Sequence, residues 1–239
     1  MIERHLMMLR SRDALSPEEE AAIRDGVSEP KTYAADTTVI RAGDELHYST
    51  LLLEGLMCRY KDLSQGQRQI TQLHVPGDFV DLHSFTLKRL EHNIMTLTRC
   101  RVVLMPHAKL KAITERFPHL TRLYWFSTNV DAAVHREWEL SLGRRSAAAR
   151  VANLLCELHA RLEIVGLTQG DSYDLQLTQT DLAECLGLTA VHVNRTLKEL
   201  RLQGLAEVKR GRVTILDMGG LMRVAEFDPR YLYLGRRAH

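Results

Sequence analysis

Paired cysteines and long hydrophobic runs are both missing from this chain. The four cysteines are Cys58, Cys100, Cys156 and Cys185. None of them forms a Cys-x-x-Cys pair, so their spacing suggests neither a zinc site nor a redox couple. The N-terminus carries only a short apolar run at residues 6–9, too short for a signal-peptide core or a membrane span. We therefore expect a cytoplasmic protein with reduced thiols, no bound metal and no membrane partner.

Net charge is also small, at +2 over 239 residues, and by itself it does not point to nucleic acid. The charge is unevenly distributed, however. Residues 189–214 contain six basic and two acidic side chains, a net charge of +4 that leaves −2 for the rest of the chain. The hydrophobic fraction of 45% is that of an ordinary folded protein, and the length predicts two modest domains.

Short aliphatic and β-branched runs between turn residues characterise residues 37–105. Turn signals at Gly43, Gly55, Gly66 and Pro76-Gly77 recur every eleven or twelve residues. This spacing is typical of an antiparallel sandwich or barrel. The sequence therefore predicts an α+β protein whose N-terminal part is an antiparallel, jelly-roll-like β-roll.

An apolar stripe at heptad spacing follows over residues 119–142. Its members are Leu123, Phe126, Val130, Ala133 and Leu140, with Glu137 interrupting the pattern. A stripe of this kind suits pairing with a second copy of the helix, and it equally suits packing on the protein's own sheet. The pattern alone leaves both arrangements open.

Residues 143–146 end this period and a new amphipathic helix is predicted over residues 147–164. The break indicates a hinge between two domains. Residues 165–173 are polar and contain glycine, which predicts a loop.

Two short helices joined by a glycine turn are predicted over residues 178–203. Thr178 and Asp181 form a capping-box-like start, and the first helix ends at Gly187. Thr189 is the N-cap of the second helix. Small Ala183 and apolar Val193 stand at the offsets that a helix-turn-helix needs for close helix approach.

The second of these helices has two distinct faces. Val193, Leu197 and Leu200 recur at the spacing of one face and are predicted to pack on the first helix. The residues predicted to point outward together are Val191, Asn194, Arg195 and Lys198. The helix therefore offers a polar and cationic face to a partner.

A basic hairpin follows the two helices. Residues 205–208 and 213–216 read as strands joined by Lys209-Arg210-Gly211-Arg212. A cationic hairpin beside a cationic helix suits contact with DNA phosphates. Although similar shapes also bind RNA or protein, the combination of caps, turn, outward stripe and wing predicts a winged helix-turn-helix that binds double-stranded DNA.

The whole chain resembles the Crp/Fnr superfamily of bacterial transcription regulators, and the resemblance covers nearly its full length. The matching motifs are Gly43-Asp44, Leu53-Glu54-Gly55 and Pro76-Gly77-Asp78-Phe79 in the roll, and Leu177-Thr178, Gly187-Leu188-Thr189 and Asn194-Arg195-Thr196-Leu197 in the helix-turn-helix. The second group is the more specific. The resemblance implies an effector domain at residues 1–118, a dimerisation helix and hinge at 119–145 and a DNA-binding domain at 146–239.

The resemblance also implies a homodimer joined along the long helix, which assigns the heptad stripe to dimerisation. Each recognition helix would then enter one half-site of a near-palindromic promoter, with half-site centres about 34 to 36 Å apart. RNA polymerase is a candidate further partner. No catalytic residues and no enzymatic activity are expected.

Family members place an arginine where Arg195 falls, so Arg195 is the principal expected base contact, suited to guanine O6 and N7. Many relatives carry glutamate where this chain has Val191, which can touch a thymine methyl instead. Asn194 and His192 are further candidate base contacts. The residues expected to meet the DNA backbone are Thr178, Thr189, Lys198, Lys209, Arg210 and Arg212.

The effector is not identified by the sequence. Relatives that bind cyclic nucleotides show Gly-Glu followed by Arg-Ser or Arg-Thr, and residues 81–96 lack that pair, so cyclic AMP is not expected. Oxygen-sensing relatives hold an iron-sulfur cluster through clustered N-terminal cysteines. Here no cysteine precedes Cys58, so no such cluster is expected. His47, His74, His83 and His92 lie in the roll without a pairing signal for haem. The alternative function is a haem- or nucleotide-dependent sensor that binds DNA only when liganded.

Two other classes of protein fit the sequence less well than a DNA-binding regulator. A metal-binding, cupin-type enzyme barrel would need a His-x-His cluster with a following Glu and His, and the strands contain none. A ligand-binding module acting through protein partners alone would not depend on Arg195. The sequence therefore favours the regulator.

Overall fold

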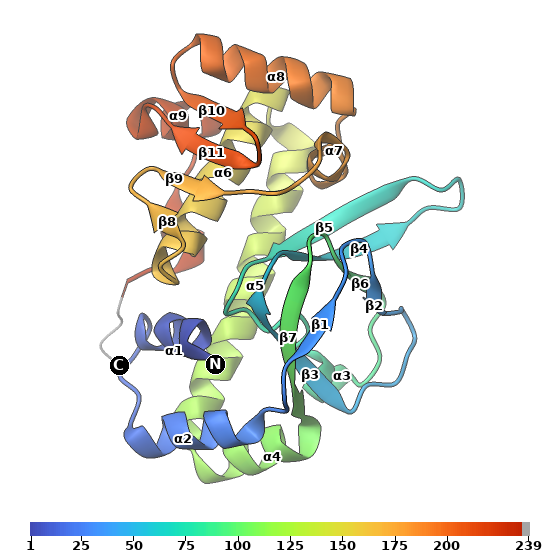
Figure 1. The fold of residues 1–239 in the computed structure, drawn as a ribbon, viewed down its shortest axis with the longest axis vertical. Helices are drawn as coiled ribbons and strands as arrows, with labels where there is room; N and C mark the ends of the chain where they lie inside the picture. Colours follow the sequence, from blue (N-terminus) through green and yellow to red (C-terminus); the bar gives the residue numbers. More distant parts are fainter. Residues whose placement is uncertain (236–239) are drawn as a thin grey trace. The chain divides into compact units, whose positions relative to one another are not determined.

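The computed structural model describes residues 1–235, which form two compact units (Figure 1). The first unit contains Met1–Lys61, Gln72–Ala132 and residues 234–235, and the second contains Asp62–Thr71 and Ala133–Tyr233. Each unit is thus assembled from segments that are distant in sequence. No helix among the described residues is long and apolar enough to span a membrane.

The β-roll is built from two sheets, with strand orders β1-β7-β3 and β2-β6-β4-β5. It belongs to the first unit except for the end of β4 and the start of β5, which lie within residues 62–71 of the second unit. The strands are β1 (Lys31–Tyr33), β2 (Thr38–Ile40), β3 (Tyr48–Glu54), β4 (Met57–Asp62), β5 (Arg68–His74), β6 (Asn93–Thr96) and β7 (Cys100–Pro106). In one sheet β1 and β3 pair antiparallel with β7, and in the other β2 and β4 pair antiparallel with β6. The predicted antiparallel roll is confirmed.

Helices cover this roll and share its core. They are α1 (Glu3–Arg10), α2 (Pro17–Gly26), α3 (Ser84–Leu87) and α4 (His107–Arg116). Leu6 of α1, Ile23 of α2 and Leu110 of α4 belong to one buried cluster with Leu51 of β3 and Val103 of β7. Burying such side chains is the main favourable contribution to folding, at about 1.5 to 3 kcal/mol each.

The longest element is α5, Pro118–Arg144, with 27 residues. Its residues up to Ala132 belong to the first unit and those from Ala133 to the second. Leu120 and Tyr124 are buried in the core of the first unit, whereas Trp125 is 68% exposed. The helix therefore has one face that serves its own core and one that is open.

The second unit contains the winged helix-turn-helix. Its elements after α5 are α6 (Ala147–Ile164), β8 (Thr168–Gln169), β9 (Ser172–Asp174), α7 (Gln179–Leu186), α8 (Ala190–Leu202), β10 (Ala206–Lys209), β11 (Arg212–Ile215), α9 (Met218–Ala225) and the 3-10 helix η1 (Pro229–Leu232). The sheet order is β10-β11-β9-β8. The helix predicted over residues 147–164 and the two helices of the motif are confirmed.

The prediction of a loop over residues 165–173 is wrong, because β8 and the start of β9 lie there. Tyr173 pairs with Val213 of β11, and its hydroxyl donates to the Leu155 carbonyl at 2.9 Å. Tyr173 is only 1% exposed. Pairing with a strand some forty residues later therefore orders a segment whose local composition is that of a loop.

A buried carboxylate holds three elements of the second unit together. Glu157 of α6 is 0% exposed and accepts hydrogen bonds from Trp138 Nε1 at 3.0 Å and Tyr231 hydroxyl at 2.8 Å. Arg161 completes the set at 3.1 Å. A buried charge is tolerated only when it is paired and hydrogen-bonded, so these contacts fix α5, α6 and η1 against one another within this unit.

Gly55 generates the first prediction. Its φ is +92°, and a Cβ there would lie 2.5 Å from the Arg99 carbonyl oxygen and 2.6 Å from Cys100 Sγ. Gly43 has a similar φ of +88° but nothing within 4 Å. Both alanine variants should carry backbone strain of about 1 kcal/mol, and Gly55→Ala should lose a further 1 to 3 kcal/mol, roughly, through overpacking. Urea unfolding measures the free energy of unfolding of both variants. Equal losses of stability in the two variants would contradict the close approach of the Arg99 carbonyl and Cys100 to Gly55.

Candidate nucleic-acid interface

Local hydrogen bonds define where helix α7 begins. The Thr178 hydroxyl accepts from the Asp181 N–H at 3.1 Å, and an Asp181 carboxylate oxygen accepts from the Thr178 N–H at 2.7 Å. This reciprocal capping box satisfies backbone donors that have no partner inside the helix. The predicted N-cap at Thr178 is confirmed.

The turn after α7 is equally well defined. Gly187 takes the left-handed conformation, with φ 60° and ψ 40°, which a residue with a side chain rarely adopts. Thr189 then caps α8, because its hydroxyl accepts from the His192 N–H at 3.2 Å. Cap, turn and second cap therefore set the angle between the two helices from the sequence itself.

Helix α8 buries one face against the rest of its unit. Val193 is 0% exposed and Leu200 is 1% exposed, as predicted. Between them Thr196 is fully buried, and Leu197, which was predicted to pack on the first helix, is only half-buried. The turn of the helix thus directs Thr196 inward and shifts Leu197 to the edge of this face.

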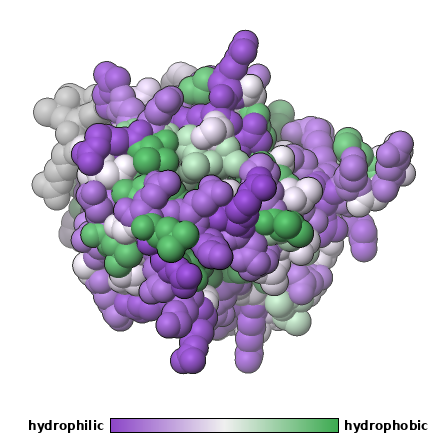
Figure 2. All heavy atoms as spheres, turned by 90° about the horizontal axis from the view of Figure 1, so that it is seen from above, coloured by the Kyte–Doolittle hydropathy of each residue, from purple (hydrophilic) through white to green (hydrophobic). Residues whose placement is uncertain are grey.

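The opposite face of α8 presents the predicted recognition residues. Val191 is 81% exposed, Asn194, Arg195 and Lys198 are exposed, and His192 is intermediate. Arg195 Nε lies 3.9 Å from a carboxylate oxygen of Glu199, one turn later. The surface seen in Figure 2 is mainly hydrophilic with separate hydrophobic patches. This face can offer cationic, amide and apolar groups side by side.

The basic residues of the wing between β10 and β11 differ in their contacts: two are exposed, and one is hydrogen-bonded within the sheet. Lys209 and Arg210 are exposed at the tip of the hairpin. Arg212 instead donates to Asp174 at 3.1 Å and to Gln169 at 2.8 Å, which ties β11 to β9 and β8. The charge of Arg212 is therefore partly engaged within the sheet, while Lys209 and Arg210 extend from it.

Two polar side chains outside the motif support the C-terminal end of α7. Gln69 donates through Nε2 to the Glu184 carbonyl at 2.7 Å, and Arg150 of α6 donates through Nη1 to the Leu186 carbonyl at 3.0 Å. Carbonyls in the last turn of a helix have no helical N–H partner. Sequence analysis missed both residues, because nothing in the local pattern connects them with a helix end so far along the chain.

The stripe predicted for dimerisation does not form one exposed face. Leu123 is 7% exposed in the core of the first unit, and Ala133 is 6% exposed in the second. Phe126 and Val130 are half-buried, and Leu140 is 50% exposed. Between residues 122 and 136 the exposed residues lie about one position earlier on the helix, at Arg122, Trp125, Asn129, Ala132 and Arg136. Packing on the protein's own core therefore takes up part of the stripe.

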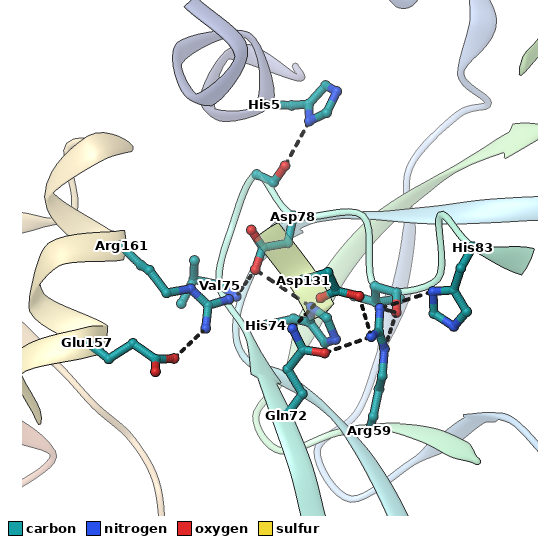
Figure 3. Close-up of polar contacts among 12 residues, drawn as sticks. His5, Arg59, Gln72, His74, Val75, Asp78, His83, Asp131, Glu157 and Arg161 are labelled. Atoms are coloured by element: carbon teal, nitrogen blue, oxygen red, sulfur yellow. Dashed lines mark hydrogen bonds and ion pairs between the residues drawn. The ribbon is translucent and has the colours of Figure 1, made fainter. Parts of the chain in front are cut away.

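A buried polar centre lies inside the first unit, formed by Arg59, Gln72, His83 and Asp131 (Figure 3). Arg59 is 3% exposed, and its Nη1 donates to Gln72 at 2.7 Å and to Asp131 at 2.6 Å. Sequence analysis missed Arg59. The available signal is an arginine within the otherwise apolar start of β4, Leu56-Met57-Cys58-Arg59-Tyr60.

Three histidines of this unit have pKa values that favour their neutral form. Burial, together with the nearby Arg59 charge, lowers the pKa of His83 to about 3 and that of His74 to about 4. Burial likewise lowers the pKa of His5 to about 4. Burial acts oppositely on the Asp81 carboxyl and raises its pKa to about 7. No group of three or more His, Cys, Asp or Glu among residues 1–235 is arranged to hold a metal ion.

These shifts predict how stability depends on pH. Histidines with lowered pKa values favour folding above about pH 6.5 and lose that contribution as the pH falls toward 4. Asp81, with a raised pKa, contributes below about pH 4 and loses its contribution as the pH rises through 7. Three histidines outweigh one aspartate, so the free energy of unfolding should fall between about pH 7 and about pH 5.

Asp81→Asn should make the loss of stability on acidification steeper, because it removes the carboxyl group whose raised pKa opposes that loss. An asparagine keeps an acceptor for the Thr50 N–H, whose nitrogen lies 2.5 Å from Asp81 Oδ1 in the wild type. Urea unfolding at the two pH values measures the difference. A wild-type protein that becomes more stable on acidification would contradict the neutral buried histidines.

Comparisons with known proteins agree with this geometry. Residues 30–117 match a family model described as a cyclic nucleotide-binding domain, and residues 149–224 match one described as a Crp-like helix-turn-helix domain. The solved structure of FixK2 from Bradyrhizobium japonicum has a TM-score of 0.75 and 24% identity, covering 83% of this chain and 96% of that one. The first match covers the strands of the roll, and the second covers α7, α8 and the wing.

Two curated relatives are closer in sequence. The nitrogen fixation regulation protein FixK of Bradyrhizobium diazoefficiens is 32% identical over 70% of this chain and 69% of its own length. The transcriptional activatory protein AadR of Rhodopseudomonas palustris is 33% identical over 70% of this chain and 68% of its own length. From these similarities and the winged helix-turn-helix described above, the chain belongs to the Crp/Fnr superfamily of bacterial transcription regulators.

Proposed function

We propose that the protein binds near-palindromic promoter DNA as a homodimer, with one helix α8 in the major groove of each half-site. The observation that carries this proposal is the outward face of α8, where Val191, Asn194, Arg195 and Lys198 are all exposed while Val193 is fully buried. A helix held firmly by its inner face can present its outer residues to base edges. We place this activity in the cytoplasm and assign no catalysis.

Arg195 is the main base contact in this proposal. Its guanidinium is suited to guanine O6 and N7, a contact that discriminates by about 1 to 3 kcal/mol. Glu199, 3.9 Å away, can orient that guanidinium. Val191 would touch a thymine methyl, Asn194 can pair with adenine, and His192 is a further candidate at the side of the helix.

Phosphate contacts supply the rest of the affinity. They would come from Thr178, Thr189, Lys198, Lys209, Arg210 and Arg212. Thr178 and Thr189 already cap helices, so their helix N-termini add backbone N–H groups aimed at phosphate. Arg212 is engaged with Asp174 and Gln169, which makes Lys209 and Arg210 the stronger contributors from the wing.

Dimerisation would use the open face of α5. Trp125 is 68% exposed and Leu140 is 50% exposed, and Phe126 and Val130 are half-buried beside them. A large exposed aromatic side chain on a helix is covered at low cost by the same helix of a second copy. A two-fold axis along α5 gives the two recognition helices the symmetry of a palindromic site.

In this proposal residues 1–118 respond to an effector or other signal, 119–145 join the subunits and 146–239 bind DNA. Residues 236–239 lie outside the described residues. RNA polymerase is the further partner that we propose, since AadR is named as an activatory protein.

Selection of duplexes from a random pool by the purified protein tests the base contacts. Wild-type protein should enrich a two-fold-symmetric site, and Arg195→Ala should weaken binding to it by roughly 1 to 3 kcal/mol per half-site and relax preference at one base pair of each half-site. Lys209→Ala is the matched control, because it should weaken all duplexes alike and reduce the salt slope by about one per half-site. Equal sequence preference in wild type and Arg195→Ala would refute the proposal that Arg195 contacts a base.

The dimer generates a separate prediction. Trp125→Glu places a charge on the open face of α5 and should shift the protein from dimer to monomer, as measured by sedimentation equilibrium. Leu87→Glu is the control, since Leu87 is 59% exposed on α3 of the same unit. If Trp125→Glu stays as dimeric as Leu87→Glu, the subunits associate through another surface.

A further inference from the structure

The roll contains a cation that is almost completely removed from solvent. Arg59 points from β4 into the interior, where its Nε and Nη2 donate to the Val80 carbonyl at 2.9 and 2.7 Å (Figure 3). Nη2 also lies 3.4 Å from His83 Nδ1. The Val80 carbonyl carries no net charge. Burial and the Arg59 charge lower the pKa of His83, so the His83 ring is neutral as well. Neither of these two partners supplies a negative charge to balance the guanidinium.

Asp131 of α5 provides that charge. Its Oδ2 accepts from Arg59 Nη1 at 2.6 Å, and its other oxygen accepts from the Gln72 amide. Although burial favours the neutral acid, the Arg59 guanidinium holds the pKa of Asp131 well below its usual range, so the carboxylate is charged. Gln72 closes the triangle by accepting from Arg59 at 2.7 Å. The guanidinium, the amide and the carboxylate thus satisfy one another.

This arrangement bears on the ligand of the domain. Residues 30–117 match a cyclic nucleotide-binding domain, and the ligands of such domains carry a phosphate. A buried guanidinium is the kind of group that binds a phosphate or carboxylate. Here that group already holds a carboxylate from the protein's own helix. An external anion that bound Arg59 would have to displace Asp131, whose side chain is 24% exposed, and would leave that carboxylate without its cation.

We propose that Asp131 is the built-in anion of the roll, taking the place of a small anionic effector at Arg59, so that α5 is fixed to the roll without any ligand. This deepens the proposed function by making DNA binding independent of a nucleotide, and it rests on that function for its regulatory meaning. The structural part of the proposal stands on Arg59, Gln72 and Asp131 alone and is tested without DNA.

The test uses three variants of the full chain. Asp131→Ala removes the anion and leaves space beside Arg59, whereas Asp131→Asn removes the charge and keeps the shape. Glu54→Ala is the control, because Glu54 pairs with Arg101 at 2.6 Å while both side chains are about half exposed. Thermal unfolding is measured in sodium chloride, sodium acetate and inorganic phosphate at equal ionic strength, and again with cyclic AMP.

We expect the wild-type Tm to be the same in all of these solutions. Asp131→Ala and Asp131→Asn should unfold roughly 5 to 15 °C lower, because each leaves the buried guanidinium without its counter-ion. Acetate should restore part of the Tm of Asp131→Ala in a saturable way and leave Asp131→Asn unchanged, since only the alanine variant has room for it. Glu54→Ala should stay within about 2 °C of wild type in every solution.

Three results would overturn the proposal. The first is a saturable rise of the wild-type Tm with cyclic AMP or phosphate, which would mean that an external anion reaches the site. The second is an Asp131→Asn variant as stable as Glu54→Ala. The third is an unstable Asp131→Ala that neither acetate nor phosphate stabilises, since Asp131 would then fill space rather than supply charge. If Asp131→Ala does not fold in chloride, it is refolded in acetate instead. Folding in acetate is the expected result, and failure to fold in acetate and in phosphate would count as the third contrary result.

Binding of the wild-type protein to its selected duplex, with and without cyclic AMP, separates this proposal from the proposed function. We expect the two dissociation constants to agree within about twofold, against a tenfold change for each 1.4 kcal/mol of coupling. Absence of any sequence-specific DNA binding, with the thermal results as expected, would count against the proposed function and leave the built-in anion standing.

Discussion

The ion pair between Arg59 and Asp131 is the interaction on which the first unit depends. A guanidinium inside a roll is tolerated only with a counter-ion and hydrogen bonds, and here β4 supplies the cation while α5 supplies the carboxylate. One pair therefore connects a strand of the roll to the helix on which we expect the subunits to meet. On the same helix Trp125 makes no such buried contact and is 68% exposed.

In the second unit the same physical rule positions the recognition helix. Glu157 is fully buried and holds α5, α6 and η1 through Trp138, Arg161 and Tyr231. Helix α8 packs on α6, and Gln69 and Arg150 secure the end of α7. With its inner face fixed in this way, α8 can present Val191, Asn194 and Arg195 without rearrangement, which lowers the cost of binding.

Local signals made the helix-turn-helix predictable from sequence. Thr178, Gly187 and Thr189 act on their immediate neighbours, and a cap or turn residue has the same meaning wherever it occurs. The features that sequence could not give depend on distant partners. Asp131 lies 72 residues from Arg59, Tyr173 needs β11 to become a strand, and the heptad stripe could not show that Leu123 would serve its own core.

The most direct test of the account is a titration of the purified, ligand-free protein with its selected duplex and with a scrambled duplex of equal length, at several salt concentrations. We predict that the selected duplex binds about 10³-fold or more tightly at physiological salt, with affinity falling as salt rises for both. Equal affinity for the two duplexes would contradict sequence-specific binding of DNA, and a preference that arises only when a nucleotide is added would contradict independence of a nucleotide.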